Sequence, residues 1–194
     1  MKNFFTVKYV GTFGFIKPWT AVRDGETFSQ QFLTPSIVEG IEKKLFPELL
    51  NERGIKKITR HRLNYLAIDI QQEKTWAKGG FAAYKDKSAY KTNMAIIKRG
   101  VMIEPNLYLA FSHEQDALIA SKQHICLCRN EDLLFPEEIT QISETHFDEI
   151  EGFELHFGAS DSTFKVGYNR FNRAQAMFGQ LKIYHNPIRQ PILS

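Results

Sequence analysis

The segment at residues 31–46, QFLTPSIVEGIEKKLF, changes character at Thr34 and Pro35 and constrains the fold more than any other stretch. Thr34 can accept a hydrogen bond from a free N–H of a first helical turn. Pro35 suits that turn because its missing N–H costs nothing there. The apolar residues that follow have helical spacing, at Ile37, Val38, Ile41, Leu45 and Phe46. The pattern predicts a helix that begins at Pro35 and buries one face.

Gly40 interrupts the predicted helix and lowers its stability by ~1 kcal/mol relative to alanine. A glycine at this position is explained if another backbone approaches the helix closely. Two explanations are open. The first is a tight contact between the helix and a sheet. The second is a nucleic acid or a protein partner near the helix start, where free N–H groups favour phosphate.

A length of 194 residues and a hydrophobic fraction of 43% suit one domain with a real core and a sizeable insertion. Strands are expected at residues 3–10, 55–70, 100–112, 124–129, 147–157, 163–168 and 180–184, with a short helix at 113–123. The strand at 55–70 should carry a bulge near Asn64, because its alternation is imperfect there. In the long connection at 12–33, Trp19 and Phe28 are expected to fill the core rather than to stack on bases.

The net charge of +3 is modest, but the charges are segregated along the chain. Between residues 71 and 99 the bases outnumber the acids by seven to two, and beyond Asp161 the chain has bases and no acid. Between residues 130 and 161 all charged residues are acidic. This distribution predicts separate basic and acidic surfaces.

Aromatic residues alternate with lysines in the basic segment 71–99. Aromatic rings offer faces on which bases stack, at ~1–3 kcal/mol per base, and lysines neutralise phosphates. The segment therefore suits single-stranded RNA. The alternative is a surface loop whose aromatic side chains pack back on the domain.

Cys126 and Cys128 are the only cysteines, and their i, i+2 spacing on a strand places them on one face, where they do not easily form a disulfide. No second pair of Cys or His at zinc spacing accompanies them, so we expect no metal site and no cofactor. The sequence fits a reduced, intracellular protein. No stretch approaches the ~20 apolar residues of a membrane-spanning helix, and Lys8 interrupts the apolar run that a signal peptide would need.

The sequence lacks the motifs of serine hydrolases, P-loop enzymes, zinc proteases and dinucleotide-binding enzymes. A metal-independent ribonuclease needs a base for the 2′-hydroxyl, an acid for the leaving oxygen and a cation on the phosphate. Two sets of residues have the required chemistry: Lys57, His61 and Tyr65, which a regular strand would point one way, and Lys182, Tyr184 and His185. A lone histidine on a strand is more often structural, so we expect neither set to be catalytic.

The first quarter of the chain resembles the opening of the CRISPR-associated Cas-five family, in which a strand, a Gly-aromatic segment with a Pro and a loop precede a TPS-x-x-x-G helix. Here these parts are FFTVKYVGTFGFIKPW, VRDGETFSQQFL and TPSIVEG. The later segment LCRNEDLLFPEEI is also similar, although Cys128 stands where the family often has Gly. The resemblance implies an α+β fold in a single domain over residues 1–194. Its core would be an RRM-like (ferredoxin-like) antiparallel sheet, with a basic thumb inserted at about 71–99 and extra C-terminal strands.

The family belongs to the RAMP proteins, and its members grip the five-prime handle of CRISPR RNA. They cap one end of a type I-like, RNA-guided surveillance complex (Cascade) in antiviral defence. They contact the adjacent Cas-seven-like backbone subunit through the thumb, and often a large subunit as well. One branch cuts the CRISPR repeat with a Tyr just after the first helix and a Lys-His pair in mid-chain. This chain has neither, so the catalytic residues of that branch do not carry over.

The residues and the resemblance together predict a noncatalytic subunit that binds CRISPR RNA in the cytoplasm of a prokaryote, without membrane contact. The residues expected to contact RNA are Ser36, Gly40, Arg60, Arg62, Lys74, Trp76, Lys78, Lys85, Lys87 and Lys91. One alternative is a metal-independent endoribonuclease that processes CRISPR repeat RNA with His61, Lys57 and Tyr65, or with His185. Another is an adaptor whose acidic surface and aromatic loop bind only protein.

Overall fold

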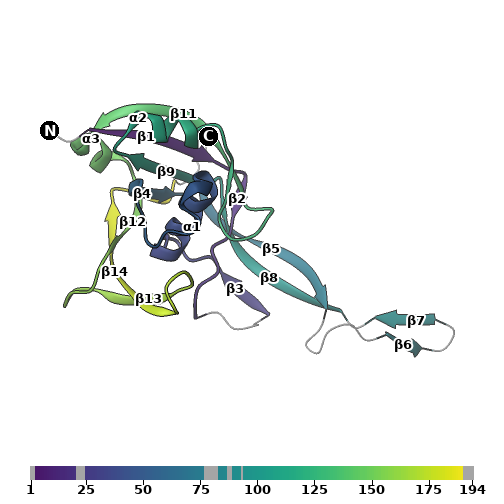
Figure 1. Ribbon diagram of the computed structural model, residues 1–194. Helices are drawn as coiled ribbons and strands as arrows, with labels where there is room; N and C mark the ends of the chain where they lie inside the picture. The colour runs from purple at the N-terminus through teal and green to yellow at the C-terminus, as the bar shows by residue number, and fades with distance from the viewer. Residues whose placement is uncertain (1–2, 21–24, 77–82, 87–88, 93, 190–194) are drawn as a thin grey trace, which may run out of the picture.

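The computed structural model describes residues 3–20, 25–76, 83–86, 89–92 and 94–189, and it has an α+β fold with a large antiparallel sheet (Figure 1). This is the fold class that the sequence predicts. For β6 (Ala83–Asp86) and β7 (Ala89–Thr92), which pair with each other, the description covers the backbone alone. Among the described residues, no helix combines the length and the apolar character that crossing a membrane requires.

The main sheet joins strands from both ends of the chain. In spatial order they are β10 (Ile125–Cys126), β11 (Leu133–Ser143), β1 (Asn3–Val10), β9 (Asn106–Phe111), β4 (Ile58–Asn64), β12 (Gly152–Phe157), β14 (Gln175–Tyr184) and β13 (Phe164–Asn169). Neighbouring strands run antiparallel. Val7 of β1 pairs with Leu109, and Leu63 of β4 pairs with Leu107, so these apolar side chains lie on one face.

Helices pack on both faces of this sheet (Figure 1). On the apolar face, α1 (Pro35–Leu45) and α2 (Glu114–Ala120) cover the strands, and Val38 and Leu45 of α1 enter the core. A short 3-10 helix, η1 (Pro47–Leu49), follows α1. On the other face, α3 (Glu144–Glu149) places Phe147 edge to face against Phe4, with ring centroids 5.9 Å apart. The two clusters use alternate residues of the same strands, as a pleated sheet requires.

The helix α1 begins at Pro35, which confirms the sequence prediction, but its start is closed differently. The Thr34 side chain makes no capping hydrogen bond. Its carbonyl oxygen accepts the N–H groups of Ile37 and Val38 at 3.0 and 3.1 Å, and its Oγ1 lies 3.4 Å from Ser36 Oγ. The backbone of Thr34, rather than its hydroxyl, therefore holds the first turn.

Two buried carboxylates of α1 hold the loop that leads into β4. Glu42 is 0% exposed and accepts hydrogen bonds from the N–H groups of residues 56–58 at 2.8, 2.6 and 2.8 Å. Glu39 accepts the N–H of Gly54 at 3.1 Å. Hydrogen bonds to ionised acceptors are strong, and they replace the water that both carboxylates lose on folding. They fix the point at which β4 begins.

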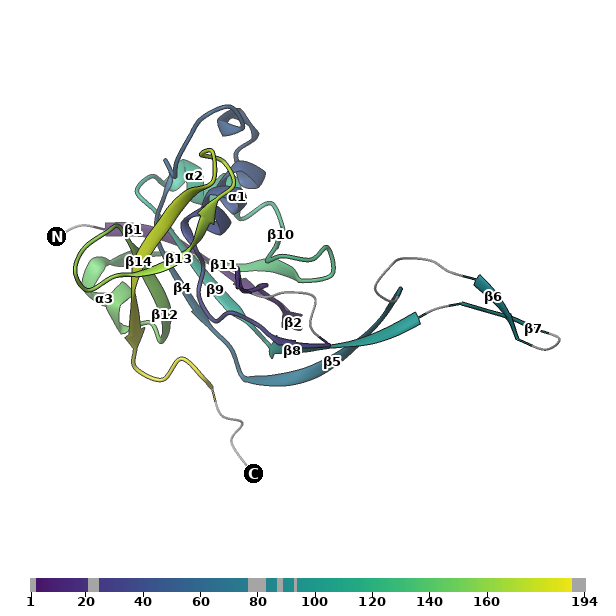
Figure 2. The same cartoon turned by 90° about the horizontal axis from the view of Figure 1, so that it is seen from below.

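A long ribbon of two strands projects from the body of the molecule (Figures 1 and 2). It consists of β5 (Ala67–Trp76) and β8 (Met94–Ile103), which pair antiparallel over their full lengths, and we call it the arm. Near the body, β2 (Phe13–Gly14) pairs antiparallel with β8, and β3 (Glu26–Phe28) pairs parallel with it. In both views β6 and β7 lie beyond the outer end of the arm.

Several expected elements differ from the structure. The strand expected at 55–70 is two strands in different sheets, because the chain leaves the main sheet after Asn64 and continues as β5. The first residues of the strand expected at 147–157 belong to α3, whose start Ser143 caps by accepting the N–H of His146 at 3.2 Å. The strand expected at 124–129 is only β10, and β14 begins at Gln175 rather than at residue 180.

The prediction that Trp19 and Phe28 fill the core is wrong, since they are 47% and 52% exposed. Phe28 lies over Gly100 of β8, where a Cβ would be 2.2 Å from a carbon of its ring. Trp19 rests on Gly167 of β13, where a Cβ would be 3.2 Å from its own Cβ. Both rings thus pack on the outside of strands, each against a glycine.

The substitution Glu42→Ala is expected to destabilise the fold strongly, because it leaves the N–H groups of residues 56–58 without their acceptor. A buried donor without a partner costs about 1–3 kcal/mol, so we expect a loss of about 3 kcal/mol in the free energy of unfolding. Urea denaturation followed by circular dichroism measures it. Glu48→Ala is the control, since the Glu48 side chain is 59% exposed and should contribute little. Equal losses for both variants would contradict the role of Glu42.

Candidate nucleic-acid interface

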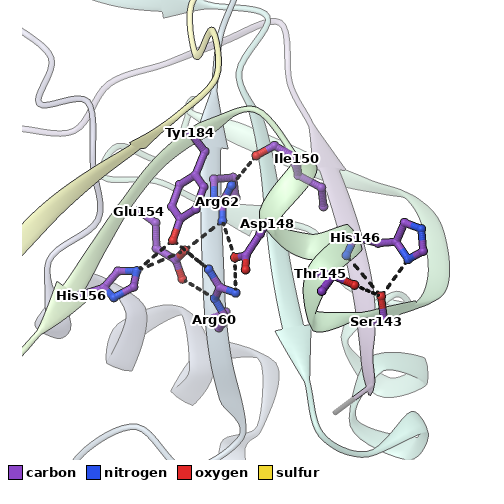
Figure 3. A network of polar contacts seen from close by, with 10 residues as sticks. All are labelled: Arg60, Arg62, Ser143, Thr145, His146, Asp148, Ile150, Glu154, His156 and Tyr184. Carbon is purple, nitrogen blue, oxygen red and sulfur yellow. Dashed lines mark hydrogen bonds and ion pairs between the residues drawn. The ribbon is translucent and has the colours of Figure 1, made fainter. Parts of the chain in front are cut away.

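Arg60 and Arg62 of β4 converge on Glu154 of the adjacent β12 (Figure 3). Arg60 donates to the Glu154 carboxylate from Nε at 3.0 Å and from Nη2 at 2.6 Å, and Arg62 Nη2 donates to it at 3.0 Å. Arg60 Nη1 also donates to Asp148 of α3 at 2.7 Å. The Arg62 side chain is 0% exposed and donates to the carbonyl oxygen of Ile150. Both guanidinium groups therefore donate to acceptors within the protein.

The charges of this network stabilise one another. Burial would raise the pKa of Glu154, but the hydrogen bonds and charge of Arg60 outweigh burial and hold that pKa below its usual value. Burial would lower the pKa of Arg60, but Glu154 and Asp148 raise it overall. We expected both arginines to contact RNA. In the structure their donors are instead directed at Glu154 and Asp148.

A pocket of about 540 Å³ lies beside this network, between β4, β12 and β14. Its lining includes His61, His156 and Tyr184, and the Tyr184 hydroxyl lies 3.4 Å from His156 Nε2. His61 is 2% exposed and stacks on Phe157, with ring centroids 5.3 Å apart. Burial lowers the pKa of His61 to about 4, so its ring is neutral at pH 7. Its Nε2 has no hydrogen-bond partner in the part of the chain that the structure describes.

The structure brings together one member of each candidate catalytic set, His61 and Tyr184. It separates them from the others. Lys57 lies before a β-bulge that breaks the alternation of β4, and its ammonium group pairs with two carboxylates. Tyr65 follows the end of β4 and stacks on a phenylalanine of β12. His185 follows Tyr184 with a φ of 51° and does not belong to the lining of this pocket.

The charges around this pocket do not suit cleavage of RNA. Glu144, Asp148 and Glu154 line it together with Arg60, whose donors already bind two of these carboxylates. Cleavage of a phosphodiester requires a cation that is free to stabilise charge on the phosphate. The acidic lining repels the RNA backbone instead, so the geometry does not favour the endoribonuclease alternative.

Lys74 and Trp76, which we expected to contact RNA, lie on the exposed face of the arm. They pair with Ile96 and Met94 of β8, which are also exposed. A cation and a half-exposed aromatic ring therefore share one face of the ribbon. The remaining lysines of the predicted RNA contact are not described at the level of side chains: Lys85 and Lys91 belong to β6 and β7, and Lys78 and Lys87 lie outside the described residues.

Arg129 holds the root of the arm from its opposite face. Its guanidinium donates to Asp132 at 2.6 Å, to Gln71 Oε1 at 3.0 Å and to the carboxylate of Glu73. Arg99 of β8 approaches the same Glu73 at 3.7 Å. These contacts neutralise the inner face of the arm and connect it to the loop between β10 and β11.

Gly40 does not face another backbone, contrary to the expectation from the sequence. A Cβ at Gly40 would lie 2.3 Å from Nη2 of Arg170, which belongs to the turn between β13 and β14. Arg170 and Lys44 line a small pocket of about 200 Å³ beside Gly40. Ser36 is only 9% exposed. The sequence analysis did not single out Arg170, although the acid-free C-terminal segment contained the signal.

No family model and no curated protein matches the sequence. The fold is similar to that of a chain in a solved structure described as a "CRISPR RNA-guided surveillance complex", with a TM-score of 0.55 over 95% of this chain and 91% of that chain. The two sequences are 9% identical. At this identity the similarity shows a shared fold.

The substitution Gly40→Ala tests which group lies against the helix. The new methyl group would displace only the end of the flexible Arg170 side chain, while alanine favours the helix by about 0.5–1 kcal/mol. We expect the free energy of unfolding to stay the same or to rise by up to ~1 kcal/mol. Thermal melts of Gly40→Ala, alone and combined with Arg170→Ala, measure it. A loss of ~1–3 kcal/mol, which is usual for overpacking, would indicate a rigid neighbour.

The buried, neutral His61 is expected to make stability depend on pH. Its pKa is about 4 in the folded chain against 6.5 unfolded, so the folded state binds fewer protons and loses stability as the pH falls from 7 to 4. The shift corresponds to about 3 kcal/mol. His61→Phe keeps a ring against Phe157 and should lose this part of the pH dependence in urea denaturation. Identical pH profiles for both proteins would show that His61 titrates normally.

Proposed function

We propose that this chain is a noncatalytic RNA-binding subunit of a type I-like CRISPR surveillance complex, in which it grips the five-prime handle of the CRISPR RNA. The observation that carries the proposal is the fold shared with a chain of a structure described as a "CRISPR RNA-guided surveillance complex", which extends over 95% of this chain and 91% of that one. The segregated basic segments of the sequence support an anionic ligand.

In this proposal the arm is the thumb of the domain, and its exposed face makes the first contact with RNA. Lys74 supplies a cation on the same face as Trp76, and this combination suits a phosphate next to a stacked base. The lysines that follow in the sequence extend the basic segment: Lys78, Lys85, Lys87 and Lys91. Arg129 binds the inner face at the root of the arm, and this contact fixes the orientation of the outer face, which carries Lys74 and Trp76.

A second contact is proposed at α1. Arg170 is exposed above Gly40, and in the described part of the chain it forms no ion pair with a carboxylate. Arg170 therefore replaces Ser36 and Gly40 as the group nearest to the RNA. Arg60 and Arg62 act indirectly, because they hold α3 and β12 in place.

The proposed protein partners follow from the same arrangement. The outer end of the arm projects from the body and suits the adjacent Cas-seven-like backbone subunit (Figure 2). Exposed acids on β11 and α3, among them Glu137, Glu138 and Glu149, suit a basic surface of a large subunit.

Replacing Lys74, Lys78, Lys85 and Lys87 together by alanine is expected to weaken the binding of single-stranded RNA. Each lost phosphate contact should lower the slope of log K against log salt by about 0.7, so the slope should change by up to about 3. Fluorescence anisotropy of a labelled RNA with the sequence of the repeat, at several salt concentrations in chelator, measures both effects.

The control variant removes the same charge from other surfaces by replacing Lys8, Arg53, Lys56 and Lys122, and its slope should stay near that of the unmodified chain. An unchanged slope in the arm variant would exclude the arm from the RNA path. If the unmodified chain binds no RNA, the result would favour the alternative of an adaptor that binds only protein. Cleavage to products with a cyclic phosphate, abolished by His61→Ala, would favour the endoribonuclease.

A further inference from the structure

Trp19 and Tyr168 form an exposed aromatic pair that belongs neither to the arm nor to the pocket of His61. Trp19 lies in the connection between β2 and β3, and Tyr168 lies on β13. Their ring centroids are 5.9 Å apart with an interplanar angle of 85°, and they are 47% and 51% exposed. In both views β13 lies at the other end of the molecule from β6 and β7 (Figures 1 and 2). The pair is therefore a separate surface feature.

Trp19 packs directly on Gly167 of β13. This residue has a φ of +129° at a break in the register of β13, and a Cβ there would lie 3.2 Å from Cβ and Cγ of Trp19. Any side chain at residue 167 would be strained and would push Trp19 away. The strand thus supports Trp19 from below and leaves nearly half of it in water. Trp19 therefore presents part of its ring to solvent in a fixed position, where a ligand can reach it.

The charged groups that contact or flank the pair are cations. Lys165 Nζ lies 4.0 Å from the centroid of the Tyr168 ring and 5.3 Å from that of Trp19, and it donates to the Tyr168 hydroxyl at 2.5 Å. Lys17 precedes Trp19 by two positions, and Arg170 follows Tyr168 by two. Among the described residues, no carboxylate forms an ion pair with any of these three cations. Residues 162–194 contain no acid at all.

We propose that the exposed part of the Trp19 ring, supported edge to face by Tyr168, is a stacking shelf for an unpaired base of single-stranded RNA, and that Lys165 and Arg170 contact the phosphates beside it. Exposed aromatic rings next to cations that form no ion pair can bind single strands through base faces and backbone charge. An acidic protein partner could pair with the cations, but its carboxylates would not stack on the Trp19 ring as a base does. The inference rests on the proposed function and adds to it an RNA contact distant from the outer end of the arm.

The experiment uses the fluorescence of Trp19 in the full-length chain. The sequence contains two tryptophans, so Trp76→Phe leaves Trp19 as the only one and keeps an aromatic ring in the arm. Titration of this variant with oligoadenylate and oligouridylate RNA is expected to quench the emission of Trp19. Adenine, which has the larger face, should quench it more strongly.

Affinities provide the second readout. In an otherwise unmodified chain, Trp19→Ala should weaken binding of oligoadenylate about 5- to 150-fold, the range for one stacked base, with an unchanged salt slope. Lys165→Ala should instead lower the slope by about 0.7. The matched control is Phe135→Ala on the acidic β11, since Phe135 is 53% exposed, and it should bind like the unmodified chain.

The outcomes separate the shelf from the proposed function. Unquenched Trp19 emission at saturating RNA would overturn the shelf and leave the proposed function in place, and so would an unchanged affinity of a folded Trp19→Ala variant. Absence of RNA binding in the unmodified chain would overturn both. Because the quenching measurement retains Trp19, it decides the question even if Trp19→Ala fails to fold.

Discussion

The carboxylate of Glu42 makes the contact on which the position of β4 depends. It is buried in α1 and accepts the N–H groups of residues 56–58, which replace the water that it loses on folding. The strand that begins there carries Arg60 and Arg62 to Glu154, a second buried carboxylate. Glu154 lies on β12, which pairs with β14, and β14 in turn pairs with β13. Two buried acids therefore place the middle of the sheet and the strands beyond it.

Ion pairing divides the cations discussed above into two groups. Arg60, Arg62 and Arg129 direct their donors at carboxylates and hold elements together. Lys165 and Arg170 have no ion-pair partner among the described residues. Cations of the second group can exchange counterions for phosphates without first breaking an ion pair. The net charge of +3 therefore does not say which cations are available to an anionic ligand, whereas the ion pairs of each cation do.

Local patterns were sufficient for α1, because the start signal at Pro35 and the apolar spacing lie within a few residues of each other, and the family resemblance supplied the fold class. They were not sufficient for the site. Arg62 meets Glu154, which lies 92 positions away, and nothing in the alternation of β4 indicates that contact. The exposure of Trp19 depends on Gly167, whose positive φ and register break appear only in the folded strand. Each failure is a contact between distant segments, which periodicity does not encode.

Arg129 lies between the two surfaces that are proposed to bind RNA. Its guanidinium binds Gln71 at the root of the arm, and its Cζ lies 5.3 Å from the centroid of the Phe15 ring, in the connection that runs from β2 to Trp19. The root of the arm and the approach to Trp19 thus share one anchor. A strand that reached both surfaces would meet contacts held at a fixed spacing, and binding at the first would raise the effective concentration at the second. Two weak contacts on one rigid frame can in this way bind a single strand that neither would hold alone.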